Sequence, residues 1–525
     1  MTYPHPAADC ASYGTLISGA LARYPERTAF VHGPNRWTYR QTAEGISRAI
    51  QQLQAWGLRP GDTVAQLSGN RPEVFWLMAA VMMSGLRSTT VHGMASLADH
   101  AYILSHCGAK ALIADEAHAT RAEELRAGSA SKLLTAAHDG PHDNFWEAAS
   151  SYAVQPLQDR TGREDVIRLA YTGGTTGRPK GVMLPNRAMV SNTLLTLIGM
   201  GLEEGVQMLL PTPISHGAGS LIVPVLLQGG TVTLQDGFDP EQLIMAIEKD
   251  RASATFLVPT MIYKLLDHPS AAQADWSSLK TLIYGAAPMA PARIKQALDL
   301  IGPVLLQGYG QTEAPNTILT LSRQDHVEAS LERLASAGRP YPGVVVALLD
   351  DNDQQVPHGE VGEICVRGPL VMSGYLDDEE QTEEAFRSGW LHTGDIARQD
   401  DQGYFYIVDR KKDMIISGGF NVYPKEIENV LTTHPAVAAA AVIGMPDPLW
   451  GEAVTALVVL RPAMHVDTDE LASLVRQEKG PVGTPKRIYF VEGLPVTALG
   501  KYDKKAMKQQ LLDADRSDVP SPFAK

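Results

Sequence analysis

Short runs of apolar residues alternate with helical patterns along the first two-thirds of the chain. Because each run is apolar at consecutive positions and is bounded by polar or glycine-containing segments, it predicts a strand buried on both faces of a parallel sheet. The longest apolar stretch, Val74–Gly85, instead predicts a buried helix that ends at its glycine. The predicted strands are Val64–Leu67, Ser88–Val91, Ala111–Ala114, Val166–Tyr171, Met208–Leu210, Thr231–Leu234, Thr255–Val258, Thr281–Tyr284 and Val304–Gln307.

Polar, glycine-rich segments follow several of these predicted strands. Ligands of open parallel sheets bind beyond the carboxyl ends of the strands, so we expect these segments to build one site together. They read TGGTTG at residues 172–177, PTPISHGAG at 211–219, YGAAP at 284–288 and GYGQTE at 308–313.

The pattern changes near Val361. The segments GEICVRG (362–368) and GYFYIVDR (403–410) alternate like half-exposed antiparallel strands. A compact α+β segment follows, with a helix starting at Pro424, a capped helix start at Asp467, and strands VTALVVL and RIYFV. We therefore predict a domain of residues 1–409 and a second domain of residues 410–525.

The composition is that of a globular protein with more than one hydrophobic core. The chain has 525 residues, of which 44% are hydrophobic and 20% are charged. Its 45 basic and 59 acidic residues give a net charge of −14, which argues against nucleic acid as the main partner. The net charge does not exclude a small anionic ligand, because a local basic patch can bind one.

Cysteine usage and the lack of targeting patterns favour a cytoplasmic protein. Cys10, Cys107 and Cys365 are far apart and form no Cys-x-x-Cys pair, so we expect neither a disulfide framework nor a zinc site. The first ten residues lack the pattern of a secretory signal, and residues 74–85 are too few to span a bilayer. Loose contact with a membrane surface stays open.

The segment Tyr171–Gly181, YTGGTTGRPKG, combines glycines with hydroxyl groups and a lysine. Glycines let the backbone approach a phosphate, while threonine hydroxyls and Lys180 add hydrogen-bond donors. The Gly-x4-Gly-Lys-Ser/Thr pattern of the P-loop is absent, because Lys180 follows Gly177 by three positions. Two interpretations stay open on this segment alone, a phosphate-binding loop and a mobile surface loop.

Four further motifs also have two interpretations each. GYGQTE could stack a base and bind a phosphate and Mg²⁺, or be a strand-to-helix turn capped by Thr312. WLHTGD (390–395) could hold ribose hydroxyls through Asp395, or be a bare turn. DRKKDMIISGGFNVYP (409–424) begins with a basic cluster at the expected domain boundary, and PVTALGKYDKK (495–505) carries a lysine near a helix start; the alternative for both is a solvated surface.

In this order and at these separations, the five motifs resemble those of the adenylate-forming superfamily, which comprises acyl- and aryl-CoA synthetases, luciferases and peptide-synthetase adenylation domains. The resemblance spans residues 12 to 512. It implies an α/β fold whose large N-terminal domain has stacked sheets flanked by helices and a distorted β-barrel, followed by a small mobile α+β domain. It also implies two half-reactions, in which a carboxylate and ATP form acyl-AMP and pyrophosphate, and CoA then displaces AMP.

The resemblance further implies how ATP would be held. The Thr172–Lys180 loop would clamp the β- and γ-phosphates, Thr312 would contact the α-phosphate, and Glu313 would bind Mg²⁺. Asp395, helped by Arg410, would hold the ribose hydroxyls, and YGAAP with Gly308 and Tyr309 would form the adenine pocket. The nucleotide-binding residues implied in this way are Thr172, Gly173, Gly174, Thr175, Thr176, Gly177, Lys180, Gly285, Ala286, Ala287, Gly308, Tyr309, Asp395 and Arg410.

Acyl transfer is implied to depend on the small domain. Lys501 would bridge the carboxylate and the α-phosphate, and Lys412 falls at the family's hinge position. His216 matches the aromatic gate beside the acyl carboxylate. After rotation about the hinge, the SGGF loop would line the thiol tunnel with Gly418, Gly419 and Phe420.

Two residues depart from the family pattern. Gly173 stands where serine is common, which removes one hydroxyl donor, although backbone N–H groups can substitute for it. Asp409 precedes Arg410 where glycine is common, which we interpret as tolerable variation.

Among members of the superfamily, the sequence favours a free-standing CoA ligase. About two dozen residues follow Lys501, too few for a carrier-protein domain. The small-residue segments GAGS (217–220) and YGAAP indicate a hydrophobic substrate, a medium- or long-chain fatty acid or an aryl or aryl-alkyl carboxylate. The expected partners are this carboxylate, ATP and CoA, and a homodimer stays open. The alternatives are an acyl-AMP ligase that loads a carrier protein and an inactive nucleotide or carboxylate binder.

Overall fold

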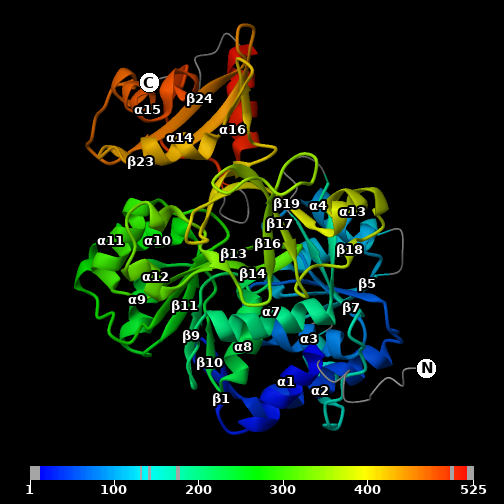
Figure 1. The fold of residues 1–525 in the computed structure, drawn as a ribbon. Helices are drawn as coiled ribbons and strands as arrows, with labels where there is room; N and C mark the ends of the chain where they lie inside the picture. Colours follow the sequence, from blue (N-terminus) through cyan, green and yellow to red (C-terminus); the bar gives the residue numbers. More distant parts are fainter. Residues whose placement is uncertain (1–11, 130–132, 140–143, 173–177, 497–501, 517–525) are drawn as a thin grey trace.

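The computed structural model describes residues 12–129, 133–139, 144–172, 178–496 and 502–516. These residues form a large unit built on two extended sheets and a small unit, orange to red at the top of Figure 1. Each strand predicted from an apolar run is present. The helices are α1 (Tyr13–Arg23), α2 (Tyr39–Ala55), α3 (Pro72–Met83), α4 (Leu97–His106), α5 (Ala119–Gly128), α6 (Phe145–Ser150), α7 (Asn186–Gly199), α8 (Ile222–Leu227), α9 (Pro240–Glu248), α10 (Pro259–Leu266), α11 (Pro291–Ile301), α12 (Arg323–Val327), α13 (Glu379–Ala385), α14 (Pro424–Leu431), α15 (Thr468–Gly483) and α16 (Lys504–Arg516).

The first extended sheet has nine strands and is parallel in its centre. The strands from β13 through β12, β11, β9 and β10 to β1 are parallel, and antiparallel strands extend both edges. In spatial order the strands are β15 (Arg339–Pro340), β14 (Ala314–Leu321), β13 (Leu305–Gln311), β12 (Thr281–Gly285), β11 (Ala254–Leu257), β9 (Gln207–Leu210), β10 (Thr231–Leu234), β1 (Thr28–His32) and β2 (Asn35–Thr38).

The second extended sheet has seven strands. Its strands β7, β4, β3, β5 and β6 are parallel, and β8 and β18 are added antiparallel at one edge. In spatial order the strands are β18 (Gly374–Tyr375), β8 (Gly181–Pro185), β7 (Val166–Tyr171), β4 (Arg87–Thr90), β3 (Thr63–Leu67), β5 (Ala109–Ala114) and β6 (Leu134–Ala137).

Alternate residues of the central strands belong to different cores, which explains why the strands are continuously apolar. Met208 and Leu210 of β9 face the main core together with α1, α3, α7 and α8, whereas Leu209 faces a second core with α9, α10 and α11. In the other sheet, Val64 faces the main core and Ala65 a third core under α4 and α5. Helices therefore cover both faces of both sheets, as expected for parallel strands.

A third sheet of four antiparallel strands lies between the large and small units. Its outer strand β20 is joined to the nine-stranded sheet by a bridge between Gly338 and Phe405, and no pairing among the described strands joins β16 to β20. The prediction that GEICVRG and GYFYIVDR are half-exposed is wrong. The five central residues of β17 are buried between two other strands, and four of the six residues of β20 are buried. The strands are β16 (Val345–Leu349), β17 (Val361–Arg367), β19 (Leu391–Gln399) and β20 (Phe405–Arg410).

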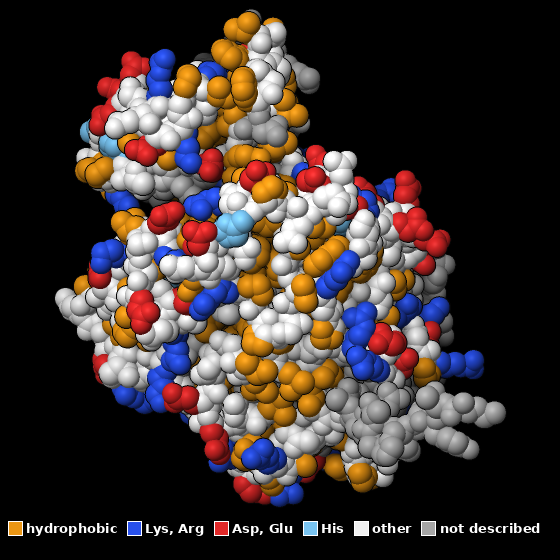
Figure 2. Space-filling view, viewed as in Figure 1, with side chains coloured by type: hydrophobic (Ala, Val, Ile, Leu, Met, Phe, Trp, Pro, Cys, Tyr) orange, Lys and Arg blue, Asp and Glu red, His pale blue; other side chains and the backbone are white. Residues whose placement is uncertain are grey.

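The small unit is an α+β layer with its own core on each face of a sheet, and Figure 2 shows it as a separate lobe. One face packs on α14 and α15 and the other on α16. Pro424 is the first residue of α14, and the Asp467 side chain caps α15 by accepting the N–H of Glu470, as predicted. The strands are β21 (Ile415–Ser417), β22 (Phe420–Val422), β23 (Val437–Asp447), β24 (Gly451–Leu460) and β25 (Arg487–Phe490).

The described residues include no helix that combines the length and the apolar character needed to cross a membrane. The apolar stretch at residues 74–85 forms most of α3, whose residues from Val74 to Met83 are all buried, and Gly85 follows with φ of 74°. Cys107 and Cys365 are free thiols inside the fold.

Candidate active site

The carboxyl ends of the two extended sheets meet. The amide of Asn70, which follows β3, donates to the carbonyls of Leu210, the last residue of β9, and of Thr212. The Thr90 hydroxyl at the end of β4 donates to the Ser215 carbonyl at 2.7 Å. Because of these contacts, the loops beyond both sets of strands border one region.

Asp395 is the centre of a polar cluster in this region. It lies on β19, is 6% exposed, and pairs in register with Arg410 on β20. The Tyr309 hydroxyl donates to Oδ2 at 2.7 Å, and Arg410 Nε donates to Oδ1 at 3.1 Å. Burial and the Asp395 carboxylate raise the pKa of Tyr309 well above its usual value, so this phenol stays protonated and a donor. The two partners fix both oxygens of the carboxylate.

The GYGQTE motif belongs to a hairpin and not to a strand-to-helix turn. Strand β13 continues through Gln311, and its pairing partner β14 starts at Ala314, so Thr312 and Glu313 form the turn. Thr312 as a helix cap is therefore wrong. The glycines of the motif suggest a loop. They are needed instead because the backbones of the two strands approach each other closely. At Gly310, a Cβ atom would overlap the backbone of Asn316.

The YGAAP motif lies beside this hairpin. Gly285 ends β12 and pairs with Gly308 of β13, whose carbonyl leaves no room for a Cβ on Gly285. Ala286 has φ of 64°, in the left-handed region that non-glycine residues avoid. Ala287 follows, half-buried. The predicted adenine-pocket residues thus lie side by side, next to Tyr309.

Glu313 and Lys180 approach the same tyrosine. The Tyr375 hydroxyl donates to Glu313 Oε1 at 2.8 Å, and Lys180 Nζ lies 4.7 Å from the centroid of the Tyr375 ring. Sequence reasoning did not identify Tyr375, because a Gly-Tyr dipeptide after a loop carries no chemical signature. Thr312 is half-buried beside Glu313 in the hairpin turn.

The glycine-rich segment between β7 and β8 is closed at its base. Tyr171 pairs with Gly181, and the Thr172 N–H donates to the Lys180 carbonyl at 3.1 Å. The other predicted phosphate-loop residues, Gly173, Gly174, Thr175, Thr176 and Gly177, lie outside the described residues.

His216 lies in the loop after β9, apart from the Asp395 cluster but at the same end of the sheet. Its ring packs edge-on against His92 with centroids 4.9 Å apart, and its Nδ1 is 2.8 Å from the Ser215 hydroxyl. Burial, with the neighbouring His92 and Arg168, lowers the pKa of His216 to about 3. The side chain is therefore neutral at physiological pH and suits an apolar or aromatic surface better than a cation would.

Residues 409–412 connect the four-stranded sheet to the small unit. Asp409 Oδ2 accepts the Lys425 N–H at 2.9 Å, so a side chain before the predicted hinge caps the start of α14 after it. Burial raises the pKa of Asp409 to about 6. Burial and the Arg410 guanidinium lower the pKa of Lys412, and Lys180 contributes to this effect.

The buried carboxylate of Glu363 is a second residue that sequence reasoning missed. It accepts the N–H of Gly394 at 2.9 Å, and Lys411 Nζ lies 3.5 Å from its other oxygen. The Lys411 N–H in turn donates to the Gly394 carbonyl at 2.8 Å. The residue before Asp395 is thereby held from both sides.

The SGGF segment is the tip of the β21–β22 hairpin, where Gly418 and Gly419 have φ of 59° and 81°. Phe420 is 61% exposed, so this tip does not pack against the large unit in the present conformation. Lys501 lies outside the described residues. Its neighbour Tyr502 is half-buried, and burial, with Tyr263 of α10 and Glu428 of α14, raises its pKa to about 12.

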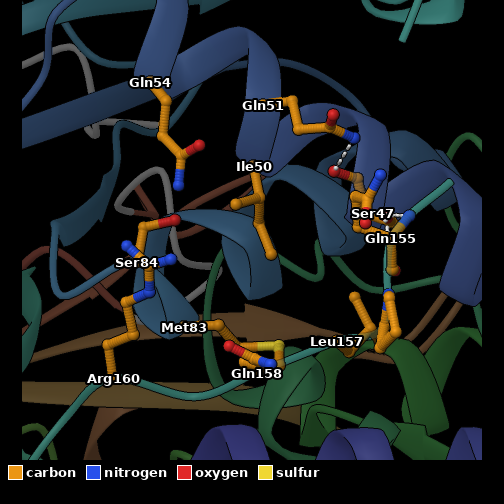
Figure 3. A pocket seen from close by; sticks show the side chains of 11 residues that line it. Ser47, Ile50, Gln51, Gln54, Met83, Ser84, Gln155, Leu157, Gln158 and Arg160 are labelled. Atoms are coloured by element: carbon orange, nitrogen blue, oxygen red, sulfur yellow. Dashed lines mark hydrogen bonds between the residues drawn. The ribbon is translucent and has the colours of Figure 1, made fainter. Parts of the chain in front are cut away.

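One hollow in the large unit, drawn in Figure 3, is not part of this region. It measures about 220 Å³ and lies between α2, the end of α3 and residues 155–160. Its lining is mainly amide and hydroxyl side chains, with Arg160 beside Ser84. Within the described ranges, no group of three or more His, Cys, Asp or Glu side chains is placed to hold a metal ion.

Comparison with protein families gives two matches. Residues 18–376 match the model of the AMP-binding enzyme family, and residues 426–501 match that of the AMP-binding enzyme C-terminal domain.

Individual relatives are similar along nearly their whole lengths. A medium/long-chain-fatty-acid–CoA ligase of Mycobacterium tuberculosis is 43% identical over 515 residues, covering 94% of this chain and 89% of its own. A feruloyl-CoA synthase of Amycolatopsis is 38% identical over 488 residues, covering 93% and 96%.

Solved structures agree with this fold. The amide bond synthetase McbA from Marinactinospora thermotolerans has a TM-score of 0.88 at 33% identity and covers 94% of this chain and 99% of its own. The o-succinylbenzoate CoA synthetase of Bacillus subtilis with its acyl-adenylate has a TM-score of 0.82 at 28% identity, covering 94% and 98%. The chain belongs to the AMP-binding enzyme family, the adenylate-forming superfamily that its five motifs resemble.

Proposed function

We propose that this protein is an ATP-dependent carboxylate–CoA ligase. A substrate carboxylate oxygen attacks the α-phosphorus of ATP, and pyrophosphate leaves with the electrons of the broken P–O bond. The CoA sulfur then attacks the acyl carbon, AMP leaves, and the thiol proton is released. The observation that carries the proposal is the buried Asp395 carboxylate, held by Tyr309 and Arg410 at the end of the sheets where the Glu313 hairpin turn also lies.

The proposed nucleotide site uses these residues in separate roles. Asp395 accepts the ribose hydroxyls, while Gly285, Gly308 and Tyr309 provide a flat backbone and ring surface for adenine. Lys180 balances the charge of the β- and γ-phosphates, and Thr312 donates to the α-phosphate. Support comes from the names of the relatives, which are CoA ligases of fatty and aromatic acids.

The residues present suit Mg²⁺ as the companion of ATP. This ion binds through one or two carboxylates together with substrate phosphates and waters, so a dedicated cluster is not required. Glu313 offers such a carboxylate, and its second oxygen is not engaged by Tyr375. When bound, the ion would neutralise phosphate charge during the displacement.

The small unit is proposed to change position between the half-reactions. In the adenylation state Lys501 would reach the reacting carboxylate, and rotation about Lys412 would bring Gly418, Gly419 and Phe420 to the thiol path. The exposed hairpin tip supports the adenylation state for the present conformation, because a tip that lined the tunnel would be buried. The capping bond from Asp409 to Lys425 crosses the proposed hinge and would open on rotation.

The proposed substrate is a hydrophobic medium- or long-chain fatty acid or an aryl or aryl-alkyl carboxylate. A neutral His216 beside Gly217 and Ala218 suits an apolar acyl group, because the imidazole ring itself carries no charge. The names of the relatives divide between these two classes, fatty acid on one side and feruloyl and succinylbenzoate on the other.

The test is release of AMP and pyrophosphate from ATP, with CoA present, across a panel of fatty, aryl and dicarboxylic acids. We expect acid-dependent AMP formation with acyl-CoA as the product. Asp395→Asn should raise the KM for ATP strongly, whereas the matched variant Asp299→Asn, which loses an exposed pair with Lys295, should not.

Three outcomes would contradict the proposal. Release of ADP in place of AMP, or no nucleotide turnover with any acid, would refute acid adenylation. Acyl-AMP formation without consumption of CoA would favour the carrier-protein alternative. Replacing CoA with an amine is a necessary control, because a solved relative is an amide bond synthetase.

A further inference from the structure

We propose that Tyr375 is a positioning residue of the nucleotide site, whose hydroxyl fixes the Glu313 carboxylate and whose ring seats the Lys180 ammonium. The inference rests on the proposed function, because Glu313 and Lys180 receive their roles from it. It adds a residue that no motif of the sequence marks.

The hydroxyl of Tyr375 has one partner among the described residues. It donates to Glu313 Oε1 at 2.8 Å, and the side chain belongs to a residue only 8% exposed. Burial and the Glu313 carboxylate raise the pKa of Tyr375 well above its usual value, so the phenol remains a donor at any physiological pH. A hydrogen bond to a charged acceptor is stronger and more directional than a neutral one. One carboxylate oxygen is thereby fixed, and the other remains available.

The ring of Tyr375 interacts with the opposite charge. Lys180 Nζ lies 4.7 Å from the ring centroid, within the range of a cation–π contact. No ion pair in the described part of the chain joins Lys180 to Glu313. The tyrosine lies next to both groups, binding the lysine through its face and the carboxylate through its hydroxyl. This arrangement keeps the two charges from pairing with each other and leaves both for a polyphosphate and its cation.

The backbone around Tyr375 holds this side chain in place. The Leu376 N–H donates to the Gly181 carbonyl at 2.8 Å, one residue after Lys180, and the Met372 N–H donates to the Glu313 carbonyl at 2.8 Å. The Tyr375 N–H donates to the Thr382 hydroxyl of α13 at 2.9 Å. Residues 372–376 therefore connect the end of the glycine-rich loop to the hairpin turn. The position of the ring does not depend on either charged group.

Two substitutions separate the hydroxyl from the ring. Tyr375→Phe keeps the ring and removes the donor, whereas Tyr375→Leu removes both. The matched control is Tyr406→Phe, another buried tyrosine whose hydroxyl donates to a carboxylate, Asp400, at 2.9 Å. Asp400 has no role in the proposed site.

The readouts are the Mg²⁺ dependence of acyl-AMP formation, the KM for ATP, and thioester formation from supplied acyl-AMP. Mn²⁺ binding to the enzyme with ATP, measured by electron paramagnetic resonance, gives a reading that does not depend on turnover. For Tyr375→Phe we expect about tenfold more Mg²⁺ for half-maximal rate and weaker Mn²⁺ binding, with the KM for ATP nearly unchanged. For Tyr375→Leu we expect the KM for ATP to rise by about fivefold in addition.

Thioester formation from supplied acyl-AMP should be unchanged in both variants, because neither charge acts in that step. Wild-type Mg²⁺ and Mn²⁺ behaviour in Tyr375→Phe would overturn the role of the hydroxyl, and equal KM values in the two variants would overturn that of the ring. A similar effect in Tyr406→Phe would show that the changes in the Tyr375 variants reflect a general loss of stability and no specific role of the hydroxyl or the ring. If the wild-type protein forms no acyl-AMP, the proposed ligase activity fails, which is a different result from any of these.

Discussion

Acidification from pH 7 to pH 5 should destabilise the large unit through His326. This residue on α12 is 1% exposed, its Nδ1 lies 2.7 Å from the Ser322 carbonyl, and its Nε2 lies 2.9 Å from the Tyr284 hydroxyl. Nδ1 faces a carbonyl, so it carries the proton of the neutral ring, and Nε2 is the acceptor for Tyr284. A second proton would place a charge in a buried site where no carboxylate of the described residues lies at hydrogen-bonding distance.

The size of the effect follows from the pKa values of the two states. Burial lowers the pKa of His326 from 6.5 to about 4. Below pH 6.5 the unfolded chain gains a proton that the folded chain does not bind, so stability falls as the pH decreases until the folded pKa is reached. Between pH 7 and pH 5 this single group accounts for about 2 kcal/mol of the free energy of unfolding.

Urea unfolding at pH 7 and at pH 5, followed by tryptophan fluorescence, measures the loss. His326→Gln is the informative variant, because its amide oxygen can replace Nε2 as the acceptor for Tyr284 but does not titrate. It should lose about 2 kcal/mol less than the wild type on acidification, whatever its stability at pH 7. His358→Gln, at a side chain 55% exposed, is the control and should behave as the wild type does. Equal losses in His326→Gln and wild type would refute the reasoning.

Three further predictions concern the two half-reactions and the nucleotide. Lys501→Ala should nearly abolish acyl-AMP formation but spare thioester formation from supplied acyl-AMP, and equal loss in both would contradict the two-conformation proposal. Lys412→Pro should spare acyl-AMP formation but impair thioester formation, because proline fixes φ and would restrict rotation of the small unit. Thioester formation at the wild-type rate would exclude this hinge. Tyr309→Phe should raise the KM for ATP by about tenfold by releasing Asp395, which a titration of initial rates with ATP measures, and an unchanged KM would show that Arg410 alone positions the carboxylate.

The sequence predicts the strands of the large unit well because consecutive residues of each strand are buried, on alternate faces of the sheet. In β9, for example, Met208 and Leu210 lie in one core and Leu209 in another. Both faces of the strand are therefore buried, and three consecutive apolar residues are required. The predicted strand ends at Gln307, whereas β13 continues to Gln311. Its continuation contains Gly308 and Gly310, which favour a loop, and the hairpin pairing with β14 overrides this preference.

The site residues divide in the same way. Asp395 and Arg410 belong to motifs, and the structure places them in direct contact. Tyr375 contacts Glu313 and Glu363 contacts Gly394, and both partners are far away in the sequence. The spacing within each pair is not that of a helix or a strand, so no local pattern indicates the contact. Such positioning contacts become visible only when the strands that carry them are paired.

The positive charges at the rim of the site give the strongest physical reason to expect a polyphosphate there. Burial and the Arg410 guanidinium lower the pKa of Lys412, and Lys180 adds to the effect from the other side. Lys180, directly before β8, and Arg410 on β20 thus both oppose protonation of Lys412, whereas Asp413 and Asp395 favour it. An anion bound beside Lys180 and Lys412 would favour the protonated form of Lys412, and by linkage a protonated Lys412 would raise the affinity for the anion. Because Lys412 lies in the proposed hinge, we expect occupation of the phosphate site to influence the position of the small unit through this charge interaction, and departure of pyrophosphate to weaken it at the step where rotation is required.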